Sequence, residues 1–258
     1  MRILISNDDG YFSLGLAALE RAAASVSDDV WTIAPEVKRS SMGHSVSLHE
    51  AFTVRELGPR RYACSGTPAD CAIAGLAWLF DQTDKPDLVL SGVNDGRNIG
   101  EDVAYSGTLS IAREAAFWGI PAIGFSSPNK TNFDTPEMTR WLADVVGGLA
   151  RNIPAWHRPD EWLSINLPTQ APAPLRHAAP GRAKIAGKIV AESTDGTRTV
   201  LRYVKGRTGD SVPGDEASLL EAGFATVYRL RWNGYAWLDD ALLDKLNHCS
   251  ASVSVDSK

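Results

Sequence analysis

Short apolar runs alternate with amphipathic segments along the first two thirds of the chain. The apolar runs are nearly unbroken stretches of Ile, Leu, Val, Ala and Phe, which is typical of strands buried on both faces. Strands in this pattern, separated by helices, favour a mostly parallel sheet flanked by helices. The predicted strands lie at about 2–6, 30–34, 88–90, 122–125 and 163–167, and the predicted helices at about 14–25, 67–80, 108–118 and 135–152.

Two regions depart from this pattern. Residues 45–65 alternate apolar and polar positions around a Gly58-Pro59 turn signal, which predicts an extended excursion. After residue 167 prolines cluster, and strands are predicted at about 184–191, 199–204 and 225–231 without helices between them, followed by a last helix at 238–247. We therefore predict an α/β catalytic core over 1–167 and a β-rich appendage with a C-terminal helix over 168–258.

Composition narrows the function classes. The chain has 258 residues, 44% hydrophobic and 22% charged, and a net charge of −5, so bulk electrostatic binding of nucleic acid is not expected. A small anionic substrate remains compatible, because a bound cation reverses the local sign of charge. The sequence has no apolar run long enough for a membrane span and no signal peptide. Its three cysteines, an odd number without close pairing, indicate reduced thiols and a cytoplasmic location.

Polar clusters follow two of the predicted strands directly, at 7–10 and at 91–98. The carboxyl ends of parallel strands are where open α/β sheets bind ligands. Adjacent buried carboxylates such as Asp8 and Asp9 repel each other, and a Mg²⁺ or Mn²⁺ ion removes that repulsion. Asn94 can add an amide oxygen from the neighbouring strand end. An Asp-Gly turn in which Asp9 caps a helix fits the residues equally well, so they leave both readings open.

Two further loops carry candidate chemistry. Gly92–Gly107 is long and rich in glycine, and Tyr105–Thr108 leads directly into a predicted helix, whose N-terminal N–H groups and hydroxyls suit a phosphate. Ordinary capping by Ser106 or Thr108 is the simpler alternative. In the loop at 38–45, Ser40 can ligate a metal weakly and His44 can donate a proton, although an isolated loop histidine is more often a surface residue. The sequence contains neither G-x-G-x-x-G after the first strand nor a P-loop.

Taken together, these segments resemble a known family. The stretches that carry the resemblance are MRILISNDDG at 1–10, APEVKRSS at 34–41, SGTPADC at 65–71, SGVNDGRNIGEDVAYSGTLSIAREA at 91–115, GIPAIGFS at 119–126 and, more faintly, DEASLLEAGFATVYRL at 215–230. They occur in the order found in the SurE (survival protein E) family of 5′/3′-nucleotidases. Several separated motifs in the right order are more specific than any one of them.

The resemblance implies a Rossmann-like, mostly parallel sheet with a β-rich C-terminal arm, which in the family often exchanges between subunits of a homodimer or homotetramer. It implies a phosphomonoesterase that hydrolyses nucleoside 5′- or 3′-monophosphates with one divalent cation per subunit, Mg²⁺ or Mn²⁺, and binds neither a membrane nor nucleic acid stably. It places catalysis on Asp8 and Asp9, the metal on Asp8, Asp9, Ser40 and Asn94, and the phosphate on Asn98, Ser106, Gly107 and Thr108.

The chain also departs from the family pattern. Asp95 and Arg97 stand where the family commonly has Ala and Pro, and Tyr11-Phe12 replaces residues that are usually smaller or a histidine. These differences affect the expected substrate preference more than the reaction class. They leave two alternatives: a non-catalytic nucleotide-binding sensor, and a phosphatase of broad specificity that also trims short polyphosphate.

Overall fold

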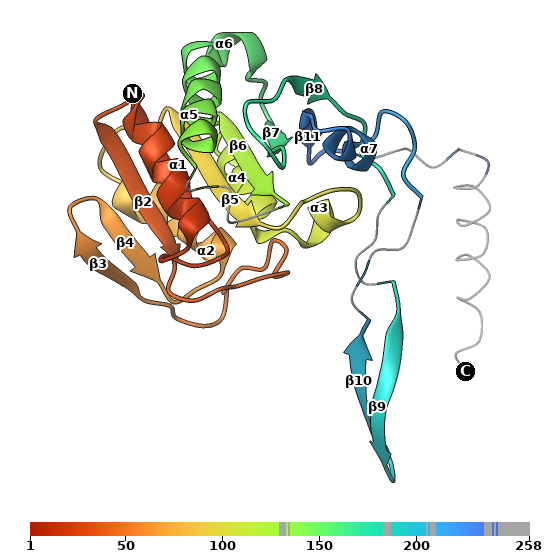
Figure 1. The fold of residues 1–258 in the computed structure, drawn as a ribbon. Helices are drawn as coiled ribbons and strands as arrows, with labels where there is room; N and C mark the ends of the chain where they lie inside the picture. Colours follow the sequence, from red (N-terminus) through yellow and green to blue (C-terminus); the bar gives the residue numbers. More distant parts are fainter. Residues whose placement is uncertain are drawn as a thin grey trace.

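The computed structural model describes residues 1–128, 133, 135–182, 187–204, 206, 210–234, 239 and 241. Nine strands form one sheet in the order β3-β4-β2-β1-β5-β6-β7-β11-β8 (Figure 1). From β4 to β7 all neighbours are parallel, whereas β3 and β11 pair with their neighbours β4 and β7 in antiparallel fashion. The strands are β1 (Arg2–Ser6), β2 (Asp29–Pro35), β3 (Val54–Gly58), β4 (Arg61–Cys64), β5 (Leu88–Asp95), β6 (Ala122–Ser127), β7 (Glu161–Asn166), β8 (Leu175–His177) and β11 (Ala225–Arg231).

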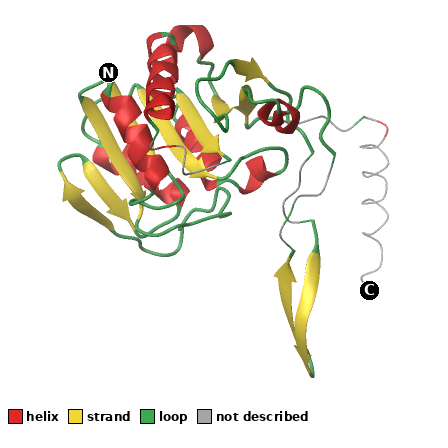
Figure 2. Ribbon diagram, viewed as in Figure 1, coloured by secondary structure: helices red, strands yellow, loops and turns green. Residues whose placement is uncertain are grey.

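Helices cover both faces of this sheet, as Figure 2 shows. One face carries α1 (Leu14–Ala24) and α5 (Pro136–Arg151), and the other carries α2 (Pro68–Ile73), the π-helical segment η1 (Ala74–Leu79) and α4 (Gly107–Phe117). The short helices α3 (Asp102–Tyr105), α6 (Ile153–Trp156) and α7 (Glu216–Glu221) lie in connections. The predicted fold class, a mostly parallel sheet flanked by helices, is therefore confirmed.

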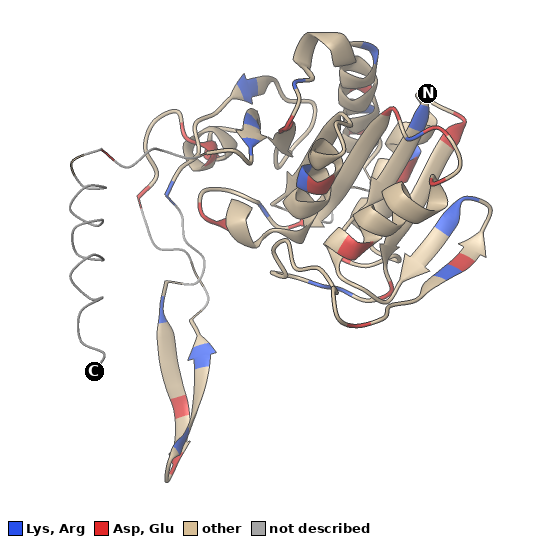
Figure 3. Cartoon of the chain, turned by 180° about the vertical axis from the view of Figure 1, so that it is seen from behind, with Lys and Arg blue, Asp and Glu red and all other residues tan. Residues whose placement is uncertain are grey.

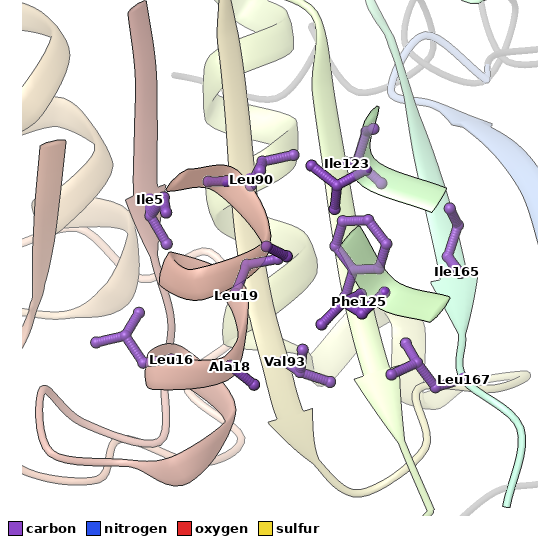
Figure 4. Packing of buried hydrophobic residues seen from close by; sticks show 14 of the residues in the cluster. Ile5, Leu16, Ala18, Leu19, Leu90, Val93, Ile123, Phe125, Ile165 and Leu167 are labelled. Atoms are coloured by element: carbon purple, nitrogen blue, oxygen red, sulfur yellow. The ribbon is translucent and has the colours of Figure 1, made fainter. Parts of the chain in front are cut away.

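The unbroken apolar runs have a direct explanation in this layering. Along β1, Ile3 and Ile5 pack under α1, while Leu4 between them packs on the α2 and α4 side, and none of the three is exposed. Figure 4 shows the first of these clusters, in which Ile5 and Leu90 of the strands meet Leu19 of α1. A strand covered on both faces needs apolar residues at every position, which is why the sequence shows no alternation there.

The excursion at 45–65 is only partly extended. β3 and β4 form the hairpin predicted around Gly58-Pro59, but residues 45–48 form no strand. The backbone N–H of Ser47 donates to Asp70 Oδ1 at 3.0 Å, and its hydroxyl donates to Asp70 Oδ2 at 2.6 Å. A side chain on α2 therefore satisfies the backbone that a strand partner would otherwise satisfy.

The C-terminal part contributes to the main sheet and also extends away from it. β11 and β8 continue the sheet beyond β7, whereas β9 (Ile189–Asp195) and β10 (Arg198–Tyr203) form a separate antiparallel hairpin. The hairpin projects from the body of the molecule (Figure 1), and every residue of its strands is exposed. The helix predicted at 238–247 lies outside the described residues except for 239 and 241.

The charges and the helices agree with the sequence-based exclusions as far as the structure describes the chain. Lys and Arg are mixed with Asp and Glu along the ribbon in the view of Figure 3. No helix within the described residues is both long and apolar enough to cross a membrane.

Asp70 offers a test of how α2 is anchored. Burial acts to raise the pKa of Asp70, but hydrogen bonds from Ser47 and Thr67 outweigh it and hold the pKa below its ordinary value. We expect Asp70→Asn to lower the free energy of unfolding in urea by about 1–3 kcal/mol, because charge-assisted bonds are lost.

The same test has a pH signature. A carboxyl with a depressed native pKa stabilises the fold above its unfolded value, and that contribution is lost as the pH falls through the native pKa. The stability difference between wild type and Asp70→Asn should therefore be constant near neutral pH and shrink below about pH 4. Asp195→Asn, at the exposed end of β9, is the control and should change little. An equal loss of stability at all pH values would contradict the assignment.

Candidate active site

A cavity of about 220 Å³ opens at the carboxyl ends of β1 and β5, beside the start of α4. This is the position at which parallel α/β sheets bind ligands. Its walls come from four segments of the chain: the end of β1, the loop after β2, the loop after β5 and the start of α4. The lining residues are Asp8, Ser40, Ser41, Asn94, Asp95, Gly96, Arg97, Asn98, Asp102, Tyr105 and Ser106.

Asp8 is the buried carboxylate of this cavity, with a residue exposure of 4%. The hydroxyl of Thr108 donates to Asp8 Oδ1 at 2.5 Å, so the first turn of α4 rests on this side chain. A β-carbon on Gly107 would lie 2.7 Å from Asp8 Cβ, so only glycine permits the approach. Burial raises the pKa of Asp8 to about 6; the Thr108 hydrogen bond opposes the shift and the negative charge of Asp9 adds to it.

Asp9 turns away from Asp8. Its Oδ1 lies 2.5 Å from Lys38 Nζ, and its Oδ2 accepts a hydrogen bond of 2.6 Å from the backbone N–H of Asp95. Asp9 lines a neighbouring hollow of about 310 Å³, whose walls include Phe12, Lys38 and Asp95. The two adjacent carboxylates therefore serve opposite sides of the strand end.

Ser40 and Asn94 reach the cavity from the loop after β2 and from β5. The backbone N–H of Arg39 donates to the carbonyl oxygen of Asp8 at 2.7 Å, which ties the Ser40 loop to the strand end. Asn94 Nδ2 donates to the carbonyl of Gly96 at 2.8 Å. That bond uses a donor and does not consume the amide oxygen that a cation would need.

The predicted phosphate seat lies at the N-terminus of α4. Ser106 caps this helix of 11 residues, its Oγ accepting from the N–H of Leu109 at 3.0 Å. This is the capping bond that the simpler alternative predicts, and the residue also lines the cavity. Because a capped helix still directs its positive end at the cavity, capping and anion binding are compatible here.

Asn98 lines the cavity but is strongly anchored. Its Nδ2 donates to Ser126 Oγ at 2.8 Å, its backbone N–H donates to Asn166 Oδ1 at 3.0 Å, and Asn166 Nδ2 donates back to its carbonyl at 3.1 Å. Ser126 and Asn166 escaped the sequence-based prediction. Their signal is a polar residue at the end of an otherwise apolar strand, on β6 and β7.

The same loop is supported from the C-terminal part of the chain. Glu216, with no exposed surface, accepts from the backbone N–H of Gly100 at 3.3 Å and also from that of Gly181. Arg182 Nε lies 2.8 Å from Glu101 Oε1. Residues about 80–115 positions apart in sequence thus hold the loop between β5 and α4 in place.

His44 lies elsewhere. Its Nε2 is 2.8 Å from Glu114 Oε2 on α4, and its ring stacks on Phe117 with centroids 5.5 Å apart. It is not one of the residues that line the cavity, so the structure does not place it where a proton donor to a leaving group would stand.

The structure thus brings the predicted residues to one edge of the sheet. Five line the cavity, two contact Asp8 from α4, and Asp9 lies on the adjacent side. In that order they are Asp8, Ser40, Asn94, Asn98 and Ser106; Gly107 and Thr108; and Asp9.

The predicted ligands fit a hard divalent cation in their chemistry. They offer two carboxylates, a hydroxyl and an amide oxygen, which is an all-oxygen set of the kind that Mg²⁺ and Mn²⁺ prefer. Among the described residues no group of three or more His, Cys, Asp or Glu side chains forms a metal cluster, so neutral oxygens would have to complete the set. The buried Asp8 carboxylate is the observation that favours a cation, because burial disfavours its negative charge.

Comparisons with known proteins agree with this geometry. Residues 3–187 match the family described as survival protein SurE. A protein of Azorhizobium caulinodans named 5′-nucleotidase SurE is 37% identical over 247 residues, covering 90% of this chain and 92% of its own. A protein of the same name from Rhodopseudomonas palustris is 36% identical over 239 residues, covering 90% and 93%.

A solved structure gives the same result for the fold. The crystal structure of the SurE protein from Aquifex aeolicus superposes with a TM-score of 0.74 at 28% sequence identity, over 97% of this chain and 100% of that one. The resemblance inferred from the sequence motifs is confirmed, and the chain belongs to the survival protein SurE family.

Proposed function

We propose that this protein is a divalent-metal-dependent 5′-nucleotidase that hydrolyses nucleoside 5′-monophosphates, and also 3′-monophosphates, to nucleoside and phosphate. The observation that carries the proposal is the buried Asp8 carboxylate at the end of β1, in contact with the first turn of a helix that points into the same cavity. The names of the relatives support the nucleotidase activity. The substrate would be a small phosphate monoester rather than nucleic acid.

One cation per subunit, Mg²⁺ or Mn²⁺, would be held by Asp8, Asp9, Ser40 and Asn94. When bound, it would supply Lewis-acid polarisation of the phosphoryl group and lower the pKa of a water molecule. The 220 Å³ cavity suits the phosphoryl group and its immediate surroundings, which leaves the nucleoside at the opening.

The chain's own residues would do the rest. The N–H groups at the start of α4, with the Ser106 hydroxyl, face the cavity and would stabilise negative charge on the phosphoryl oxygens. Asp8 or Asp9 would orient the attacking water or accept its proton, and the raised pKa of Asp8 suits a base that works near neutral pH. The mechanistic rival is attack by one of these carboxylates to form an aspartyl phosphate, which a beryllium fluoride adduct on the side chain would reveal.

We also propose that the protein is a cytoplasmic homodimer or homotetramer assembled through the β9–β10 hairpin. The hairpin's apolar side chains support this: Ile189 is 50% exposed, Leu201 59% and Tyr203 62%. A protruding two-stranded ribbon is marginally stable alone and gains from packing on another surface. Cys64 and Cys71 are free and buried, which suits a reducing compartment.

Asp8→Asn tests the metal and catalytic assignment. We expect Mn²⁺-dependent phosphate release from AMP to fall at least about a thousandfold, because the substitution removes charge from the proposed cation site. Asp81→Asn, on an exposed loop, is the control and should retain activity. Full activity of Asp8→Asn would refute the assignment. AMP binding by the wild type without EDTA-sensitive phosphate release would favour the sensor, and equal rates on a panel of phosphomonoesters would favour the broad-specificity phosphatase.

Thr108→Val tests the contact between α4 and Asp8. The variant keeps the shape of the side chain and removes the hydroxyl that donates to Asp8. We expect kcat/KM for AMP to fall about tenfold to a hundredfold, the usual cost of a lost hydrogen bond to a charged group. Thr108→Ser keeps the donor and should remain within a few-fold of wild type, whereas equal losses in both variants would show that the methyl packing matters instead.

Leu201→Glu combined with Tyr203→Glu tests the assembly proposal. Two charges on the exposed apolar side chains of β10 should convert the oligomer to a monomer in sedimentation equilibrium, because an apolar interface does not accept unpaired charges. Arg198→Glu on the same strand alters charge without touching those side chains and serves as the control. A monomeric wild type, or an unchanged mass in the double variant, would contradict the proposal.

A further inference from the structure

The ammonium group of Lys38 lies between two carboxylates. Its Nζ is 2.5 Å from Asp9 Oδ1 and 3.5 Å from Asp95 Oδ2. The backbone N–H of Asp95 donates to the other oxygen of Asp9 at 2.6 Å. The three residues therefore form a closed arrangement across the strand end, which we call the Lys38 bridge.

The two ion pairs of the Lys38 bridge differ in environment. The Asp9 side chain is 5% exposed, whereas those of Lys38 and Asp95 are 49% and 35% exposed. Water screens the Lys38–Asp95 pair strongly and the contact on Asp9 much less. Lys38 is therefore bound chiefly to the buried carboxylate, and Asp95 offers it a second, more solvated partner on the outer side.

This arrangement bears directly on a cation at Asp9. An oxygen with an ammonium 2.5 Å away can coordinate a metal only if the ammonium moves, and a positive charge that stays nearby repels a dication. Asp95 removes part of that cost, because Lys38 needs to shift only from one carboxylate to the next to keep a partner.

We propose that Lys38 is a positioning residue that competes with the divalent cation for Asp9, and that Asp95 is the partner that receives Lys38 when the cation binds. The inference rests on the proposed function, since it assumes a cation at Asp9. The Lys38 bridge then sets the metal affinity of the site, and Lys38 itself touches neither substrate nor reacting atoms.

The test is calorimetric titration of Mn²⁺ into the full-length, EDTA-treated protein at low ionic strength. Lys38→Gln should bind Mn²⁺ about tenfold or more tightly than wild type, because one positive charge leaves the vicinity of the ion. Asp95→Asn should bind it several-fold more weakly, because Lys38 loses its second partner and a negative charge disappears. The double variant should lie closer to Lys38→Gln than to Asp95→Asn. Lys188→Gln makes the same change in net charge on the exposed base of the hairpin and should match wild type.

Lys38→Met, which keeps the aliphatic stem, guards against a folding defect in Lys38→Gln, and thermal unfolding without metal identifies any such defect. Unchanged or weaker Mn²⁺ binding in a folded Lys38 variant would overturn the inference and would show that the lysine supports the ligand geometry. A wild type that binds Mn²⁺ and releases phosphate from AMP, with variants of unaltered affinity, removes this inference alone. A wild type that binds no Mn²⁺ removes the proposed metal dependence together with it.

Discussion

The burial of one carboxylate at the end of the central strand constrains the rest of the site. Asp8 can occupy its position only because α4 approaches closely, with glycine at 107 in van der Waals contact and the Thr108 hydroxyl on Oδ1. A buried carboxylate has little free energy to gain from water, so its charge depends on groups that the fold brings to it. The cavity, the capped start of α4 and the loop carrying Ser40 are arranged around that requirement.

A second constraint is the division of work between adjacent residues. Consecutive side chains on a strand end point to opposite sides, so Asp8 faces α4 and the cavity, while Asp9 faces Lys38 and the backbone of Asp95. One carboxylate is thus tuned by burial and a hydroxyl, and the other by an ion pair and an amide. The same short sequence, Asp-Asp-Gly, supplies two electrostatically distinct groups.

Much of this could be predicted from the sequence, because local patterns determine it. The buried strands follow from unbroken apolar runs, and the polar residues after β1 and β5 converge because parallel strands end at one edge. Pairings between distant segments could not be predicted in this way. Nothing local shows that Ser47 will satisfy Asp70, that Asn98 and Asn166 will bond reciprocally, or that Lys38 will reach Asp9. These contacts depend on register and loop geometry, which hydrophobic periodicity does not encode.

The support of the active-site loop by Glu216 has an evolutionary consequence. Every residue proposed to touch cation or phosphate lies before residue 109, yet the loop at Gly100 is braced by a side chain more than a hundred positions later. The strand and helix that carry Glu216 also complete the edge of the sheet. The C-terminal part is therefore not an accessory that a lineage can shorten or replace freely, and the two parts of the gene are bound to diverge together.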